Sequence, residues 1–272
     1  MSTHADLHGR EMATYYGRGR EDARLASADG RLEFERTCDL LGRLLPAAPS
    51  RILDIGGGTG RYAEWLALRG HDVVMLDPIP LHIEQASERA AGAQFEVVLG
   101  DARDLAFPDA SFDAAIALGP LYHLVERDDR VRAIREAVRI VRPGGRLAFA
   151  AISRLASLLG GAQESVSDPA FWDIVEGDLR DGRHVPGPEG RYFVHAFFHG
   201  PEHLRSEGRD AGLAEVEVLA VEGPFWLMPD LDQRWESPEA WRLMLDAIRR
   251  IERDESSLGA SCHLLLTGRR PA

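Results

Sequence analysis

The feature that most constrains the fold is a short apolar run that ends in a series of glycines. Residues 51–55 have the pattern of a buried strand, and they lead into Asp54-Ile55-Gly56-Gly57-Gly58-Thr59-Gly60. Glycines at such positions allow positive φ angles and let a ligand approach the backbone closely. A helix is expected over 61–69, and the first N–H groups of a helix have no partner within it. Open α/β sheets bind ligands at such places, outside the carboxyl ends of their strands.

Strand patterns alternate with helical patterns along much of the chain, which is typical of βαβ units and a parallel sheet. Two later strand patterns bring the expected sheet to seven strands, so we predict a doubly wound, Rossmann-like α/β fold. The expected helices in this part are 61–69, 81–91 and 127–141, and the expected strands are 51–55, 73–76, 95–99, 112–118, 146–152, 216–221 and 263–267.

The segments outside this alternation predict additions to a single domain that spans 1–272. Residues 1–45 have helical apolar spacing and are expected to form a lid. Residues 153–190 are mixed in character and rich in Gly and Asp, and 192–198 are apolar and aromatic, which indicates that 153–200 form a cap inserted after strand five. Residues 50–152 are then the ligand-binding half, and 201–272 complete the sheet.

The later part of the chain gives less regular signals. A short helix is expected near 171–175 in the cap. Helices are also expected over 201–211, which has Pro in its first turn, and over 238–253. Between these two helices, residues 224–232 read as an aromatic loop.

Charge and hydropathy argue against several classes of function. The formal net charge is −12, whereas nucleic-acid-binding proteins usually carry a basic excess. No apolar run approaches the roughly 18 residues that a membrane helix needs. The N-terminus lacks the apolar stretch of a secretion signal. We therefore expect no nucleic acid, no membrane and a cytoplasmic location.

Neither the cysteines nor the histidines indicate a metal centre. Cys38 and Cys262 lie far apart in the sequence and are expected to be buried thiols, not a disulfide. His195, His199 and His203 are spaced by four residues, but Gly200-Pro201 interrupts any helix that could align them. We therefore expect no metal ligands.

The glycine loop alone leaves the ligand open. A dinucleotide fingerprint needs Gly-x-Gly-x-x-Gly, and counting from Gly56 places Arg61 at the last position. Counting from Gly58 places Ala63 there, which is a permitted variant, so a dinucleotide remains possible. A Walker-type phosphate loop is absent, because no Gly-Lys-Ser/Thr follows.

Further segments, in order, carry a resemblance to a known family. The glycine loop resembles the first motif of class I S-adenosylmethionine-dependent methyltransferases. Asp77 is similar to the acidic residue at the end of their second strand, and Gly100-Asp101-Ala102 to the segment at the adenine. The family's fourth strand and the turn before its fifth resemble 112–118 and 142–147. The match is dense over residues 50–152 and loose elsewhere.

This resemblance implies a cofactor, S-adenosylmethionine, and its product S-adenosylhomocysteine. Two carboxylate oxygens of Asp77 suit the ribose diol. Asp101 could accept from the adenine amine while the Ala102 N–H donates to a ring nitrogen, and Asp54 either anchors the loop or faces the methionine amino group. The expected cofactor-binding residues are Tyr15, Tyr16, Asp54, Gly56, Gly57, Gly58, Gly60, Asp77, Pro78, Asp101, Ala102, Arg103, Leu118 and Gly119.

The methyl acceptor is expected near the end of strand four. The segment Gly119-Pro120-Leu121-Tyr122-His123 differs from the Asp/Asn-Pro-Pro-Tyr signature of enzymes that methylate planar nitrogens, and it resembles the small-molecule branch. His123 is a candidate general base, with packing or a cofactor contact as the alternative. Tyr122 is a candidate catalytic residue and substrate contact, with core packing as the alternative. The expected acceptor-binding residues are Tyr122, His123, Phe198, His199 and Trp226, although His199 could simply begin a helix.

We therefore predict transfer of a methyl group to an oxygen, nitrogen or carbon atom of a small organic acceptor, by a monomer or homodimer. Aromatic residues in the cap suggest an acceptor of apolar or ring character, as in specialised metabolism. Three alternatives stay open: methylation of RNA or protein, binding of S-adenosylmethionine without catalysis, and a dinucleotide oxidoreductase.

Overall fold

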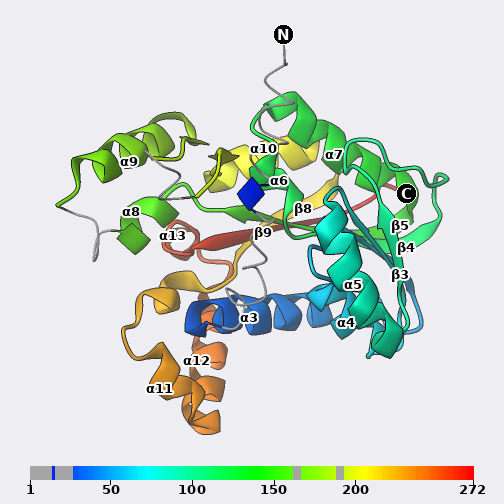
Figure 1. The fold of residues 1–272 in the computed structure, drawn as a ribbon, viewed down its shortest axis with the longest axis horizontal. Coiled ribbons are helices and arrows are strands. Elements are labelled where there is room, and N and C mark those ends of the chain that lie inside the picture. The colour runs from blue at the N-terminus through cyan, green and yellow to red at the C-terminus, as the bar shows by residue number, and fades with distance from the viewer. Residues whose placement is uncertain (1–13, 16–26, 162–166, 188–192) are drawn as a thin grey trace. The chain divides into compact units, whose positions relative to one another are not determined.

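The seven strands expected from the sequence form one sheet, in the order β3-β2-β1-β4-β5-β9-β8 (Figure 1). The computed structural model describes residues 14–15, 27–161, 167–187 and 193–272. The strands are β1 (Arg51–Ile55), β2 (Asp72–Asp77), β3 (Glu96–Leu99), β4 (Phe112–Ala117), β5 (Val141–Ile152), β8 (Ala214–Ala220) and β9 (His263–Arg269).

The first five strands are parallel, and the chain winds outward from β1 in both directions. β1 pairs with β2 on one side and with β4 on the other, in parallel register. β9 runs antiparallel to β5. Two hydrogen bonds show this direction: the Gly144 amide donates to the Arg270 carbonyl, and the Ser153 amide donates to the Cys262 carbonyl. The sheet is therefore mixed. The reversal of strand order beside β1 is the switch point at which doubly wound sheets bind ligands.

The central strands are short apolar runs because the sheet is covered on both faces. In β2, the four residues from Val73 to Leu76 are at most 2% exposed. Parallel strands buried on both faces lose the alternation of polar and apolar residues, which is the pattern of this sequence. The strands predicted from apolar runs are thus confirmed within one or two residues for β1 to β4.

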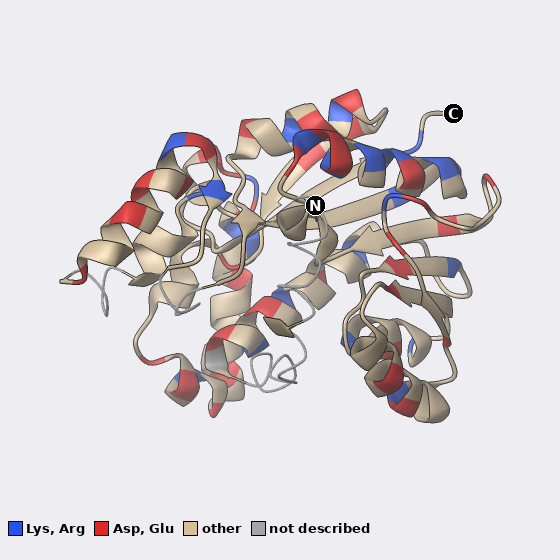
Figure 2. Ribbon diagram, turned by 45° about the horizontal axis from the view of Figure 1, so that its top comes forward, with Lys and Arg blue, Asp and Glu red and all other residues tan. Residues whose placement is uncertain are grey.

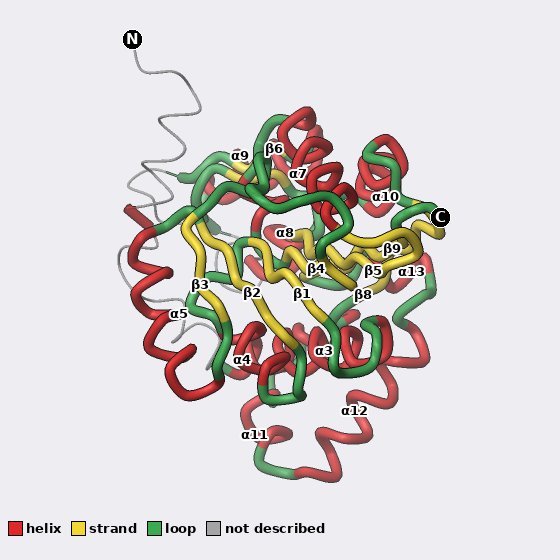
Figure 3. Tube along the Cα trace, turned by 90° about the vertical axis from the view of Figure 1, so that its right-hand side faces the viewer, coloured by secondary structure: helices red, strands yellow, loops and turns green. Residues whose placement is uncertain are grey.

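Contacts divide the chain into two compact units. We call residues 41–150, 203–217 and 266–272 the sheet unit, and residues 1–40, 151–202 and 218–265 the cap unit. In the sheet unit, helices α4 (Arg61–Ala67) and α5 (Pro80–Ala93) cover one face of the sheet, while α7 (Arg127–Ile140) and α10 (Pro201–Asp210) cover the other (Figure 3). A single turn, α6 (Pro120–His123), follows β4.

The cap unit is mostly helical and has its own apolar core. Leu32, Leu231, Met244 and Ile248 are buried together in it. It also contains the two-stranded sheet of β6 and β7. Its described elements are α3 (Ala28–Leu44, whose last turn belongs to the sheet unit), α8 (Ala156–Gly161), α9 (Pro169–Asp181), β6 (Arg183–His184), β7 (Ala196–Phe197), the 3-10 turn η2 (Gly223–Leu227), α11 (Leu231–Trp235), α12 (Pro238–Ile251) and α13 (Glu255–Leu258).

Two sequence predictions need correction. The strand expected to begin at residue 146 begins at Val141, because Gly144 and Gly145 stay hydrogen-bonded to Arg270 across the turn. The loop expected over 224–232 contains η2 and the start of α11. This segment coils because Phe225 and Trp226 both pack against the cap core.

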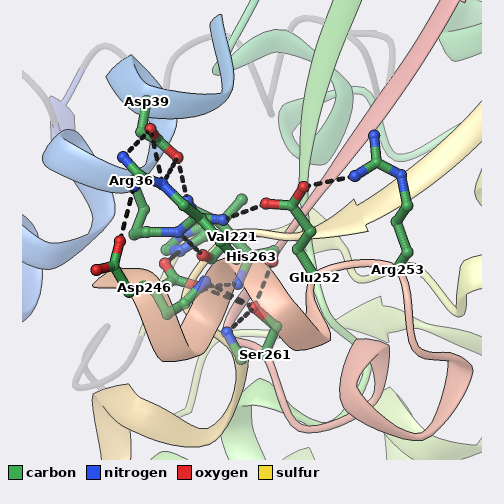
Figure 4. Close-up of polar contacts among 11 residues, drawn as sticks. Arg36, Asp39, Val221, Asp246, Glu252, Arg253, Ser261 and His263 are labelled. Atoms are coloured by element: carbon green, nitrogen blue, oxygen red, sulfur yellow. Dashed lines mark hydrogen bonds and ion pairs between the residues drawn. The ribbon is translucent and has the colours of Figure 1, made fainter. Parts of the chain in front are cut away.

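A network of buried charges joins the cap unit's segments (Figure 4). The Arg36 side chain on α3 is fully buried; it donates to the Val221 carbonyl and pairs with Asp39 and Glu252. His263 pairs with Glu222, 2.6 Å away. Burial lowers the pKa of His263, but the surrounding acids and the Cys262 thiol raise it well above its usual value. The imidazole is therefore a cation that balances a buried acid.

Other expectations concern single residues or whole helices. Cys38 and Cys262 are both thiols, as predicted, with Cys38 buried and Cys262 half-buried. Of the expected 1–45 lid, helix α3 and the helical pair 14–15 are described. Among the described helices, none combines the length and the apolarity that crossing a membrane requires.

A second buried ion pair fastens α7 to α10 within the sheet unit. The Arg130 guanidinium lies 2.7 Å from the Glu207 carboxylate, and both side chains are only 2% exposed. The same guanidinium donates to the carbonyls of Leu124 and Val125. An exposed pair, Arg127 with Asp210, joins the same two helices.

We predict that Glu207→Ala destabilises the protein by about 3 to 5 kcal/mol, because it leaves the Arg130 charge buried without its carboxylate. Arg127→Ala is the matched control and should cost about 1 kcal/mol or less, since its pair is solvated. Urea unfolding of both variants measures this difference. Equal losses would contradict the role assigned to the buried pair.

Candidate functional site

The glycines in the loop between β1 and α4 adopt the positive φ angles that were expected of them. Gly56, Gly58 and Gly60 have φ angles of 68°, 58° and 84°. At Gly56 a Cβ atom would lie 2.6 Å from Cγ of Pro120. At Gly57 it would lie 2.6 Å from Cγ of Met75 and 2.7 Å from Oδ2 of Asp54. Larger residues are therefore excluded at Gly56 by conformation and crowding, and at Gly57 by crowding.

The loop is held against the end of β2 by its own amides. The Gly56 and Gly57 amides both donate to the Leu76 carbonyl, at 2.6 and 3.2 Å. The Gly58 amide donates to Oδ2 of Asp77, at 3.0 Å. No described atom lies within 4 Å of where a Cβ of Gly58 would be. The open side of the loop is therefore at Gly58, beside Asp77, and a ligand can approach the backbone there.

Asp77 is buried at the end of β2, and its carboxylate is already well bonded. Besides the Gly58 amide, it accepts from the Ile79 amide at 2.9 Å and lies 3.0 Å from Nδ1 of His82. A carboxylate offers about four acceptor positions. Asp77 therefore has capacity for a further donor, and a diol would compete with the Gly58 amide. His82 is not among the residues predicted from the sequence, where its only signal is its place in the first turn of the helix after Asp77.

Asp54 is fully buried, and burial, followed by the charge of Asp77, raises its pKa to about 7. The Ala63 backbone lowers the pKa of Asp54 only in part. Within the described residues, neither carboxylate oxygen makes a hydrogen bond of ordinary geometry. Asp54 is thus a buried acid that a cationic group would stabilise in its charged form.

Asp101 and Arg103 form a two-pronged ion pair after β3. Two guanidinium nitrogens of Arg103 contact the Asp101 carboxylate, the closer at 2.6 Å, and a third lies 3.1 Å from Asp129. Burial raises the pKa of Asp101, but the hydrogen bonds from Arg103 outweigh this and lower it. Any ligand group that donates to Asp101 therefore shares it with Arg103. Ala102, the residue between them in the sequence, is buried.

The segment after β4 packs Tyr122 and His123 together, with ring centroids 4.6 Å apart. The Tyr122 hydroxyl makes a long contact of 3.4 Å to the Leu118 carbonyl and lies near Gly119. Burial lowers the pKa of His123 to about 4, although Asp77 raises it in part. The imidazole is therefore neutral, and so low a pKa gives little driving force for taking a proton from an alcohol or phenol. This favours packing or cofactor contact over catalysis for His123.

These side chains belong to one electrostatic cluster in the sheet unit. Asp77 acts on the pKa values of both Asp54 and His123, and His82 also lowers that of His123. The residues come from the ends of three neighbouring strands and from the first turn of α5. The topology thus brings together the residues that the sequence analysis selected here. Pro78, beside Asp77, is exposed.

The remaining predicted residues lie in the cap unit. Tyr15 packs edge-on against Phe193, with centroids 5.6 Å apart, whereas Tyr16 lies outside the described residues. His199 is fully buried, and its backbone bonds to the end of β5. Trp226 donates to the Ala260 carbonyl at 2.9 Å. Phe198 is buried. Their proposed contacts with cofactor or acceptor stay predictions.

Comparison with known proteins places this site in a family. A model described as a methyltransferase domain matches residues 53–149. The 27-O-demethylrifamycin SV methyltransferase of Amycolatopsis mediterranei is 34% identical over 251 residues, which covers 87% of this chain and 83% of that protein. The chain belongs to the class I S-adenosylmethionine-dependent methyltransferase family. The family's cofactor is S-adenosylmethionine, which sets aside the dinucleotide that Ala63 left possible.

Other similar proteins match a smaller part of this chain or share only its fold. An uncharacterized methyltransferase of Mycobacterium tuberculosis is 45% identical over 104 residues, which is 38% of this chain and 40% of that protein. A solved S-adenosylmethionine-dependent methyltransferase of Thermotoga maritima, titled a possible histamine N-methyltransferase, superposes with a TM-score of 0.59. It is 22% identical, and the match covers 95% of this chain and 99% of that one, so it shows the shared fold.

Asp54 should make the stability of the unliganded protein fall as pH rises. The folded state keeps a proton on Asp54 up to about pH 7, whereas an unfolded aspartate releases it near pH 4. The stability from this group is therefore complete below pH 4 and is lost as pH rises through 7. Relative to Asp54→Asn, the wild type should lose about 1.5 kcal/mol of unfolding free energy between pH 5.8 and pH 8.

Urea unfolding at the two pH values measures this loss. The control is Asp72→Asn, at the solvent-exposed start of β2, which should leave the pH dependence unchanged. A wild type that follows the same pH dependence as Asp54→Asn would show that Asp54 is ionised throughout this range.

Proposed function

We propose that this protein transfers a methyl group from S-adenosylmethionine to an oxygen, nitrogen or carbon atom of a small organic acceptor. The observation that supports it most is the open side of the glycine loop at Gly58, with Asp77 beside it and the buried Asp54 in the same cluster. An open backbone fits the approach of the cofactor, and the two acids fit its diol and its cationic amino group.

In this proposal, different residues of the sheet unit bind different parts of the cofactor. Asp77 accepts from the ribose hydroxyls, and Asp54 faces the methionine ammonium, whose charge would offset the burial that raises the pKa of Asp54. The Ala102 amide and Asp101, shared with Arg103, bind the adenine. Leu118 and Gly119 line the path to the reacting methyl group.

The cofactor, when bound, supplies a methyl group already activated on a positively charged sulfur. The protein then has to align the acceptor atom with the methyl–sulfur bond and exclude water. A general base is needed only where the acceptor must lose a proton. The low pKa of His123 makes that residue a poor choice for the task.

A small acceptor is the proposal that the charges and the relatives support best. The net charge is −12, and acidic and basic residues are interspersed along the helices (Figure 2). Such a surface offers little to a polyanion such as RNA. The Amycolatopsis relative is named for methylating a rifamycin compound, which is a small molecule. We therefore place the acceptor among small organic molecules.

Asp77→Ala should weaken binding of S-adenosylhomocysteine by about tenfold or more, the equivalent of losing roughly 1.4 kcal/mol of contacts to the ribose. Isothermal titration calorimetry measures the dissociation constant. Asp72→Ala, at the exposed end of the same strand, is the matched control and should bind like the wild type. Unchanged affinity in Asp77→Ala would refute the ribose role.

A screen of purified protein with S-adenosylmethionine and a library of small metabolites tests the function itself. The expected result is a product heavier by one methylene and formation of S-adenosylhomocysteine, both read by mass spectrometry. Methylation of RNA or protein, with no small molecule modified, would contradict the acceptor class. Tight cofactor binding with no transfer to any acceptor would favour a binding protein without catalysis.

A further inference from the structure

The two oxygens of the Asp77 carboxylate are used unequally by their neighbours in the sheet unit. Oδ1 accepts from the Ile79 amide at 2.9 Å and lies 3.0 Å from Nδ1 of His82. Oδ2 accepts from the Gly58 amide at 3.0 Å. Each carboxylate oxygen offers about two acceptor positions. Among the described residues, Oδ1 therefore has two partners, whereas Oδ2 has one and keeps a position for a ligand.

His82 reaches Oδ1 because the chain turns into a helix shortly after β2. Ile79 has an extended backbone before the helix, and Pro80 begins α5 with the φ angle that suits the first helical position. His82 then lies in the first turn, where its ring can meet Asp77. A carboxylate oxygen can only accept a hydrogen bond, so Nδ1 of His82 carries the hydrogen and donates it.

The hydrogen bond between His82 and Asp77 is sealed from water, since the two side chains are 6% and 5% exposed. A ligand that displaced His82 from Oδ1 would leave the ring N–H buried without this acceptor. Such a loss costs more than a hydroxyl that was already solvated regains by replacing it. We therefore expect His82 to keep Oδ1 when a ligand binds.

The free position of Oδ2 lies beside the open side of the glycine loop. Oδ2 is bonded to Gly58, where no described atom lies within 4 Å of a Cβ position. Oδ1, by contrast, is bonded to Ile79 and His82, which are 6% and 4% exposed. The Gly58 amide keeps its own place on Oδ2, because it holds the loop against β2. One donor from a ligand can thus be accepted by Asp77.

We propose that His82 is a positioning residue that restricts Asp77 to one of the two ribose hydroxyls of the cofactor. A free carboxylate can accept from both hydroxyls of a vicinal diol, one on each oxygen. With Oδ1 held by His82, only one hydroxyl finds an acceptor on Asp77. This inference rests on the methyltransferase function proposed above and narrows the ribose role of Asp77. A cofactor analogue that lacks the other hydroxyl should therefore bind nearly as well as the parent compound.

The test compares S-adenosylhomocysteine with its 2′-deoxy and 3′-deoxy analogues. Isothermal titration calorimetry gives the dissociation constant of each compound. The wild type should bind one deoxy analogue about tenfold or more weakly than S-adenosylhomocysteine, because a hydrogen bond to a carboxylate is lost. It should bind the other deoxy analogue within about threefold of S-adenosylhomocysteine, because the missing hydroxyl had no acceptor on Asp77.

His82→Leu removes the donor and keeps a side chain that can stay buried. Oδ1 is then free to accept the second hydroxyl. The analogue that the wild type tolerates should therefore bind this variant about fivefold or more weakly than S-adenosylhomocysteine does. A role of His82 in stability alone would not change this ratio. If His82→Leu does not fold, His82→Met replaces it, because methionine also lacks a donor and adapts to irregular space.

Two further variants identify the cause. His82→Asn places an amide N–H near the position of Nδ1, so it should keep the wild-type pattern. Glu84→Gln, at an exposed position of α5, is the matched control and should keep that pattern too. Thermal unfolding of each variant, with and without S-adenosylhomocysteine, checks that the compared proteins are folded.

The outcomes distinguish this inference from the proposed function. If S-adenosylhomocysteine fails to bind the wild type, the proposed function fails. If it binds, but both deoxy analogues lose about tenfold or neither does, Asp77 is not restricted to one hydroxyl and the inference is refuted. A wild-type pattern in a folded His82→Leu would also refute it. So would His82→Asn that behaves like His82→Leu, since the N–H of His82 would then not be the cause.

Discussion

The close approach of the glycine loop to its neighbours is the constraint on which the site depends. Pro120 occupies the space where Gly56 would have a side chain, and Met75 and Asp54 do the same at Gly57. The loop therefore sits directly against β2, where its amides bond to Leu76 and Asp77. The space beside Gly56 and Gly57 is filled, whereas no described atom lies within 4 Å of a Cβ at Gly58, so packing leaves the loop open to a ligand there.

Asp54 differs from two other buried acids of the described residues in having no cationic partner. Glu207 pairs with the guanidinium of Arg130, and Glu252 with that of Arg36. Asp54 has no such partner among the described residues, and burial beside Asp77 raises its pKa instead. A low-dielectric site that holds two acids close together favours a cationic ligand over an anionic one. The same arrangement holds His123 neutral, since desolvation outweighs the attraction of Asp77.

Much of the fold could be predicted because its signals are local. Apolar runs such as 51–55 and 73–76 are buried on both faces of the sheet, so composition alone identifies them as strands. The predictions for the start of β5 and for the segment at η2 were wrong for a common reason. Gly144 bonds to Arg270, and Phe225 packs on a core that includes Leu32, so distant parts of the chain decide both. No window of sequence around these segments contains that information.

The sequence by itself determined the sheet, the glycine loop and the acids at its strand ends, because strand order and spacing fix where those residues lie. The tertiary structure alone decided that His82 contacts Asp77, that Arg103 forms an ion pair with Asp101, and that Asp178 contacts His184. These contacts join side chains at no characteristic spacing. They depend on where a helix ends and how the chain turns back, as at Gly182, and on how far burial shifts a pKa, as at His123. Both are properties of packing.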